Sequence, residues 1–185
     1  MRLMTGYRRP KNLRDYLCRA KTDYHPEKDG DTPDPIYRPN VCTIENCEIC
    51  PKIDKSGKIA INGHETKNTK YNINCQSSNI VYCIECKCCN KRYIGETKRT
   101  LHERIKEHIA DIAHRRYEKS EVAYHFNRPG HKRKEDVKVY ILEFVYEHPA
   151  SKIANKIRKN LEWDWVQRLK TIIPLGMNIM EARFG

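Results

Sequence analysis

Four cysteines within seven residues, flanked by two β-prone runs, constrain this chain more than any other feature. The stretch NIVYCIECKCCNKRYIGET (residues 79–97) places the short polar turn KCCN between the runs, which predicts a hairpin. Cys86 and Cys89 have the C-x₂-C spacing that lets two thiolates reach one tetrahedral ion. The chain has nine cysteines, an odd number, and its N-terminus lacks the apolar core of a signal peptide. Both observations favour metal ligation, with zinc as the leading idea, over a disulfide framework.

The charge of the chain favours a polyanionic partner. Its 36 Lys and Arg residues exceed its 24 Asp and Glu residues, which gives a formal net charge of +12. Such an excess attracts polyanions, and nucleic acid is the first expectation. No apolar run approaches the length that crosses a bilayer, so we expect no membrane partner and an intracellular protein.

Composition divides the chain into three expected segments. Residues 1–40 are basic and contain proline, which predicts an arm or linker. Residues 41–78 are poor in large apolar residues, include a possible small hairpin, and need a staple. This segment offers four thiolates for a closed metal site, with His64 as a possible substitute ligand: Cys42, Cys47, Cys50 and Cys75. The alternative is incidental cysteines in a loose linker. Residues 79–180 have the pattern of a folded domain.

The pattern after the hairpin predicts helices and one more strand. Leu101, Ile105, Ile109 and Ile112 recur at helical spacing, with Thr97 or Thr100 as N-cap. A short helix is expected around SEVAYHFN (120–127), a buried strand in DVKVYILEFVY (136–146), and a last helix that ends before Pro174. The order β-β-α-α-β-α predicts an α+β fold with a small three-stranded antiparallel sheet flanked by helices.

Five residues form the candidate chemistry of this domain. Tyr82 and Tyr93 lie on the two hairpin strands, and Gly95 allows a close approach to the backbone. Arg104 and His108 are four residues apart, so they project from one helix face, which we place beside the apolar stripe rather than on it. Glu162 precedes Trp165 and Val166, which places its carboxylate at the edge of the stripe of the last helix. Singly, each has an ordinary structural explanation, such as an ion pair of Glu162 with Arg158.

Taken together, these motifs resemble a known nuclease pattern. The pattern resembles that of the GIY-YIG nucleases in four parts: IVY (80–82), YIG (93–95), the helix with Arg104 and His108, and the late Glu162. The sequence more closely resembles the endonuclease domain of Penelope-like retroelements, over about residues 42–180 and through NIVYCIECKCCNKRYIGETKRTLHERIKEH, AYHFNRPGH and EWDWVQRLKTIIPLGMN. RRPKNLRDYL near the start resembles the segment that joins reverse transcriptase to endonuclease. The first motif begins with Ile80 where the family name has Gly.

The resemblance implies metal-dependent hydrolysis of a DNA phosphodiester. Glu162 would hold Mg²⁺ or Mn²⁺, because hard cations prefer oxygen ligands. Arg104 would bind the scissile phosphate, and Tyr82 would accept the proton of the attacking water if its pKa were lowered, or otherwise orient that water. Tyr93 and His108 would bind the water or the phosphate. The residues expected to hold flanking DNA are Lys98, Arg99, Arg115 and Arg116.

The resemblance also implies the remaining ligands, partners and role. His125 and His131 would join Cys86 and Cys89 in a structural Cys₂His₂ zinc site, so that with the cysteines of residues 41–78 we expect two zinc ions. The nuclease would act in the nucleus, where it would nick target DNA and expose a 3′ hydroxyl. A reverse transcriptase domain of the same polyprotein would use that hydroxyl, and the element RNA is a further expected partner. The alternative is a zinc-stabilised nucleic-acid-binding module without catalysis, and a redox protein is a distant third.

Overall fold

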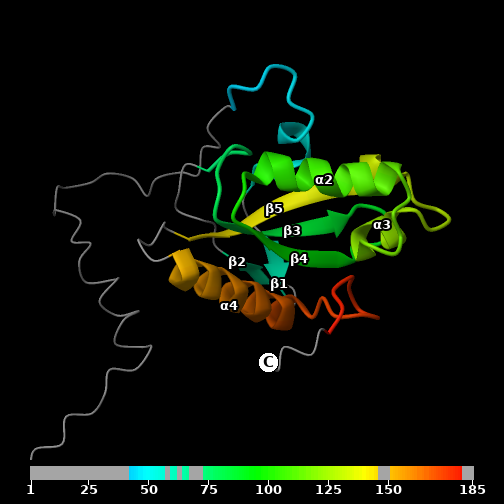
Figure 1. Ribbon diagram of the computed structural model, residues 1–185. Coiled ribbons are helices and arrows are strands. Elements are labelled where there is room, and N and C mark those ends of the chain that lie inside the picture. Colours follow the sequence, from blue (N-terminus) through cyan, green and yellow to red (C-terminus); the bar gives the residue numbers. More distant parts are fainter. Residues whose placement is uncertain (1–41, 57–58, 62–63, 67–72, 146–150, 181–185) are drawn as a thin grey trace, which may run out of the picture. The chain divides into compact units, whose positions relative to one another are not determined.

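Three antiparallel strands form the sheet that the sequence predicts. β3 (Ile80–Cys86) is central, with β4 (Arg92–Thr97) on one side and β5 (Val137–Phe144) on the other (Figure 1). The computed structural model describes residues 42–56, 59–61, 64–66, 73–145 and 151–180. The basic arm expected over residues 1–40 lies outside them.

The sheet is the middle of three layers, because side chains alternate along β3. Tyr82 and Ile84 pack on one face with α2 (Leu101–Ala113) and α3 (Glu121–Phe126). Val81 and Cys83 point to the other face and pack with α4 (Ser151–Leu169). Figure 1 shows α2 and α4 on opposite faces of the sheet. The predicted α+β class with flanking helices is therefore confirmed.

Helix α2 begins with a complete capping box. The Thr100 hydroxyl accepts from the Glu103 backbone N–H, and the Glu103 carboxylate accepts from the Thr100 N–H. The buried residues of α2 are Leu101, Ile105, His108 and Ile112. The placement of His108 beside the apolar stripe was therefore wrong: at helical spacing it lies between Ile105 and Ile112, and a partner in the sheet makes its burial possible.

The cysteine-rich segment packs on the same core as the sheet. Ile49, Ile53 and Ile73 belong to the cluster that covers the α2 face. Ile53 forms a parallel bridge with Val139 of β5, next to the short 3₁₀ helix η1 (Cys50–Lys52). The small hairpin expected here is present, with β1 (Ile59–Ile61) antiparallel to β2 (His64–Thr66). A second 3₁₀ helix, η2 (Arg133–Asp136), leads into β5.

Helix α4 is anchored to the sheet by a buried cation. Arg158 is 3 % exposed, and its guanidinium donates to Glu96 (2.8 Å), Asn79 (2.9 Å) and Asn155 (3.3 Å). The sequence pattern suggested Arg158 only as an ion-pair partner of Glu162, in the ordinary structural alternative. Glu96 on β4 and Asn79 just before β3 tie α4 to the sheet, whereas Asn155 lies on α4 itself. Among the described helices, none is long and apolar enough to cross a membrane.

We expect Arg158→Ala to lower the free energy of unfolding by about 3 kcal/mol, because it leaves the Glu96 carboxylate and the Asn79 amide without their buried partner. Lys156→Ala removes an exposed cation from the same helix and is the matched control, with an expected change within about 0.5 kcal/mol. Chemical denaturation of both variants measures the difference. Equal stabilities would contradict the anchoring role.

Candidate active site at the edge of β4

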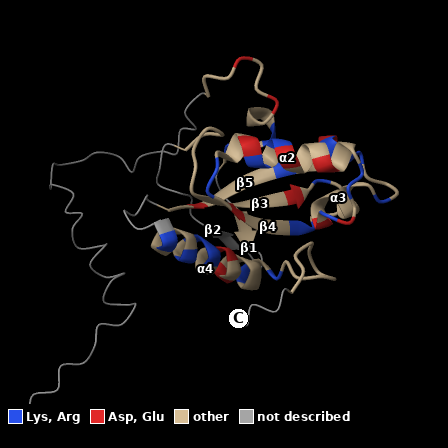
Figure 2. Ribbon diagram, viewed as in Figure 1, with Lys and Arg blue, Asp and Glu red and all other residues tan. Residues whose placement is uncertain are grey.

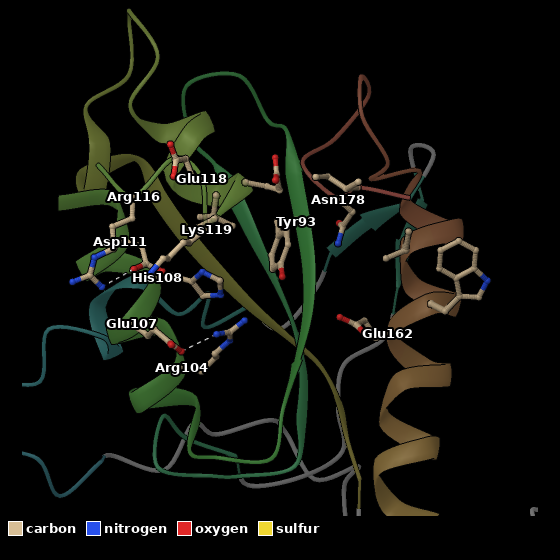
Figure 3. Close-up of a pocket in the computed structure, with 16 residues that line it drawn as sticks. Tyr93, Arg104, Glu107, His108, Asp111, Arg116, Glu118, Lys119, Glu162 and Asn178 are labelled. Carbon is tan, nitrogen blue, oxygen red and sulfur yellow. Dashed lines mark hydrogen bonds and ion pairs between the residues drawn. The ribbon is translucent and has the colours of Figure 1, made fainter. Parts of the chain in front are cut away.

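A pocket of about 560 Å³ opens at the edge strand β4 (Figure 3). Tyr93 of β4, Arg104 and His108 of α2, and Glu162 of α4 all line it. Because β4 has no further strand beside it in the three-stranded sheet, side chains from both helical layers reach the same space around its edge. The structure thus brings together four of the five residues that the sequence singled out.

Tyr82, the fifth residue, lies behind the pocket and is fully buried. Its hydroxyl oxygen lies 2.8 Å from His108 Nε2 and accepts a hydrogen bond from Arg104 Nε at 3.1 Å. Burial raises the pKa of Tyr82 well above its ordinary value, so the phenol is neutral. One buried hydroxyl therefore connects the two α2 residues that face the pocket.

Gly95 creates the space for this hydroxyl. It pairs with Tyr82 across β3 and β4. A Cβ on Gly95 would lie 2.5 Å from the Tyr82 hydroxyl oxygen and 2.7 Å from Cζ, closer than side chains approach. The close approach predicted for Gly95 is thus the approach of the Tyr82 ring.

His108 is held neutral inside the site. It is 5 % exposed, and burial, followed by the nearby Arg104 guanidinium, lowers its pKa to about 3. The Tyr93 ring meets it edge to face at 5.6 Å between centroids. Its Nδ1 is buried and has no hydrogen-bond partner among the described residues. A neutral imidazole with one uncommitted nitrogen therefore lies in the pocket wall.

The expected DNA-binding residues are exposed but differ in their relation to the pocket. Arg116 lines it and pairs with Asp111 at 3.1 Å. Arg99 shares the Glu107 carboxylate with Arg104. Lys98 and Arg115 are exposed outside the pocket lining. Figure 2 shows further basic residues along α4 and in the segment between α2 and α3. Contact of these residues with DNA stays a prediction.

Sequence reasoning missed Asn178. Its side-chain oxygen accepts from the Ile94 N–H at 2.9 Å, and its amide donates to the Ile94 carbonyl at 2.8 Å. The Met177 N–H also donates to the Arg92 carbonyl. Asn178 therefore satisfies the Ile94 backbone N–H and carbonyl on the outer edge of β4, and it also lines the pocket. Asn178 ends the stretch EWDWVQRLKTIIPLGMN that resembles the retroelement endonucleases, but no role was assigned to it, because its partners lie on β4.

The two predicted ligand groups each converge. The donor atoms of Cys86, Cys89, His125 and His131 all lie within 4.8 Å of one another, with Cys89 Sγ 3.4 Å from His125 Nε2 and 3.7 Å from His131 Nε2. Ligands of a tetrahedral zinc lie about 3.3–3.8 Å apart, given bonds of about 2.0–2.3 Å. His131 Nδ1 lies 3.3 Å from the Pro129 carbonyl, which leaves Nε2 for a metal. This group joins the hairpin turn to α3 and the loop after it.

The fourth ligand of the second group, Cys75, comes from the end of the cysteine-rich segment. The sulfur atoms of this group all lie within 4.8 Å of one another: those of Cys42, Cys47, Cys50 and Cys75. Cys75 Sγ is 3.7 Å from Cys47 Sγ and 3.5 Å from Cys50 Sγ. The side chain of His64 lies outside the described part, whereas His102 Nδ1 is 3.7 Å from Cys47 Sγ. Both groups thus have the composition and spacing to hold a zinc ion.

The remaining two cysteines of the hairpin differ in burial. Cys83 is fully buried in the sheet, and exposed Cys88 turns its thiol toward the Gly130 carbonyl at 3.5 Å. Neither belongs to a ligand group among the described residues.

Comparison with known proteins identifies the domain. The family model described as the GIY-YIG catalytic domain matches residues 78–173. The chain belongs to the GIY-YIG family. Its enzyme class is accordingly that of the DNA endonucleases, as the sequence predicted.

Two solved structures are also similar to this GIY-YIG protein. A mutant form of the catalytic domain of intron endonuclease I-TevI is 25% identical, with 57% of this chain and 96% of that chain covered and a TM-score of 0.41. The catalytic domain of homing endonuclease I-TevI is 23% identical, with 55% and 97% covered and a TM-score of 0.41. No curated protein matches the chain.

We expect Gly95→Ala in the YIG motif to lower both stability and nuclease activity, because the added methyl group displaces the Tyr82 ring. The expected loss of stability is about 1–3 kcal/mol. In a Tyr82→Phe background, which removes the closest atom, the same substitution should cost less, and thermal unfolding of the four proteins measures this coupling. A Gly95→Ala protein as stable as the parent would refute the packing explanation, since Cζ of the Tyr82 ring lies 2.7 Å from the added Cβ even without the hydroxyl.

Proposed function

We propose that this GIY-YIG protein hydrolyses DNA phosphodiesters in the pocket at β4 with the help of a divalent metal ion. The observation that supports this most directly is that one pocket is lined from both faces of the sheet (Figure 3). Arg104 and His108 reach it from one face and Glu162 from the other. A guanidinium, a neutral imidazole and a carboxylate provide an anion-binding group, a hydrogen-bonding group and a hard oxygen ligand.

Each residue has a proposed role in this hydrolysis. Glu162 would hold Mg²⁺ or Mn²⁺, an ion that stabilises negative charge developing on the phosphate oxygens. Arg104 binds the scissile phosphate, and Tyr93 faces the attacking water from β4. We assign Tyr82 a positioning role, since its raised pKa opposes proton acceptance.

The Tyr82 hydroxyl also determines what His108 can donate. Because this oxygen accepts from Arg104 Nε, its own hydrogen can be donated to His108 Nε2, which leaves the imidazole hydrogen on Nδ1. That nitrogen has no partner in the described part of the chain. It is the group that we assign to the phosphate or the water.

We further propose a retroelement context for this activity. The chain would be the C-terminal part of a polyprotein and would nick one strand in the nucleus, so that the linked reverse transcriptase extends the exposed 3′ hydroxyl on the element RNA. The similarity to Penelope-like endonucleases over residues 42–180 and the net charge of +12 support this role. A binding module without catalysis shares the charge and the cysteines, but it does not need Arg104, His108 and Glu162 in one pocket.

We expect Glu162→Ala and Arg104→Ala each to slow the nicking of supercoiled plasmid in Mg²⁺ by about 10²–10³-fold, as for removal of one group that stabilises a charged transition state. Asp164→Ala, which removes an exposed carboxylate from the same helix outside the pocket, is the control and should cut at the parental rate. Retained folding is checked by circular dichroism. Parental rates in both pocket variants would make the binding module the better description.

We also propose that the two ligand groups hold structural zinc. Four protein ligands in each leave no open position for water, so these ions would stabilise folding rather than act on DNA. The Cys₂His₂ group would clamp the hairpin that carries Tyr82 and Tyr93. The Cys₄ group would fold a segment that has few large apolar residues.

Metal analysis of the purified protein should therefore find two zinc ions per chain, one for each group. Cys89→Ala and Cys50→Ala should each remove one ion, whereas Cys88→Ala should retain both, since the Cys88 thiol lies outside the group. Less than one zinc in the parent protein would rule out both sites.

A further inference from the structure

One carboxylate oxygen in the active site connects two arginines. Glu107 Oε2 accepts from Arg99 Nη2 at 2.6 Å and from Arg104 Nη1 at 2.7 Å. Arg99 precedes α2, whereas Glu107 and Arg104 lie one turn apart on it. The geometry therefore places a single anionic oxygen between two guanidinium groups.

Glu107 Oε2 lies between a partner that is held by buried structure, Arg104, and a partner that is exposed to solvent, Arg99. Arg104 is held from behind, because its Nε donates to the buried Tyr82 hydroxyl. The Glu107 side chain is 42% exposed and that of Arg99 is 56% exposed. Figure 3 shows Glu107 and Arg104 joined at the pocket wall, across from Glu162. Arg104 is thus a fixed cation, whereas Glu107 and Arg99 are free to rearrange.

A carboxylate and a phosphodiester compete for the same guanidinium edges, since both present anionic oxygens to planar N–H donors. Glu107 stays ionised, because the hydrogen bond from Arg104 lowers its pKa below the ordinary value. Each ion pair is substantially exposed to water, and such exposed pairs contribute little to stability. A DNA phosphate can therefore replace Glu107 at a small free-energy cost.

We propose that Glu107 Oε2 occupies a phosphate subsite: in the DNA complex a phosphodiester oxygen bridges Arg99 and Arg104, and Glu107 moves away. This inference rests on the proposed function, because it assumes that DNA enters this pocket. It makes Glu107 a competitor of the substrate, and it assigns Arg99 to the same phosphate as Arg104 rather than to flanking DNA.

The test compares DNA binding by two isosteric variants without cleavage. A fluorescein-labelled duplex is titrated without added Mg²⁺ or Mn²⁺ and without chelator, so that the proposed zinc ions stay bound, with anisotropy as the readout, against the parent, Glu107→Gln and Glu118→Gln. Glu118 is an exposed carboxylate that lines the same pocket, so its variant has the same change in net charge. Glu107→Gln should bind about two- to fivefold more tightly than Glu118→Gln, the range expected from releasing an exposed ion pair. In an Arg99→Ala background this gain should shrink.

Two outcomes would overturn the subsite. Equal affinities of the two variants would mean that only long-range charge acts, and weaker binding by Glu107→Gln would mean that Glu107 holds the arginines in their binding positions. The proposed nuclease function is read separately, from Mg²⁺-dependent nicking by the parent protein. A parent that nicks DNA while Glu107→Gln gains nothing refutes the subsite alone, and a parent that binds but never nicks refutes the nuclease.

Discussion

The buried hydroxyl of Tyr82 is the constraint on which the active site depends. A hydroxyl inside the sheet must have hydrogen-bond partners, and its side of the sheet is covered by α2. Arg104 and His108 supply them, one turn apart on the buried side of that helix. These bonds determine how α2 is rotated about its axis. Gly95 completes the arrangement from the neighbouring strand, because no other residue leaves room for the Tyr82 ring.

The position of β4 at the edge of the sheet explains how opposite layers contribute to one pocket. Side chains of α2 and α4 are separated by the sheet everywhere except around this strand. Arg158 fixes α4 against β4 one helical turn before Glu162, and Asn178 satisfies the outer backbone groups of Ile94. The edge strand is therefore both protected from further pairing and open to a ligand.

Local patterns in the sequence predicted the elements, whereas long-range partners decided the details that it missed. The hairpin and the strand that ends at Phe144 follow from turn residues and an apolar run, and Thr100 is one of the two N-cap candidates that the sequence offered. The close approach at Gly95 was also readable, although the approaching group was not. The burial of His108 could not be predicted, because a polar residue enters a core only when a distant group satisfies it. Asn178 was missed for the same reason, since its partners lie on β4.

The two ligand groups contact the active site through backbone rather than through the pocket. Backbone N–H groups at the start of α2 have no partner within the helix, and here His102 donates to the Cys75 carbonyl and Leu101 to the Ser77 carbonyl. The Cys₄ group therefore fixes the end of α2 from which Arg104 projects one turn later. The Cys₂His₂ group joins the turn between β3 and β4 to α3, which packs beside α2. A metal ion bound at either group would therefore act on the relative position of Tyr82, Tyr93 and Arg104, because these residues stand on the elements that the two groups connect.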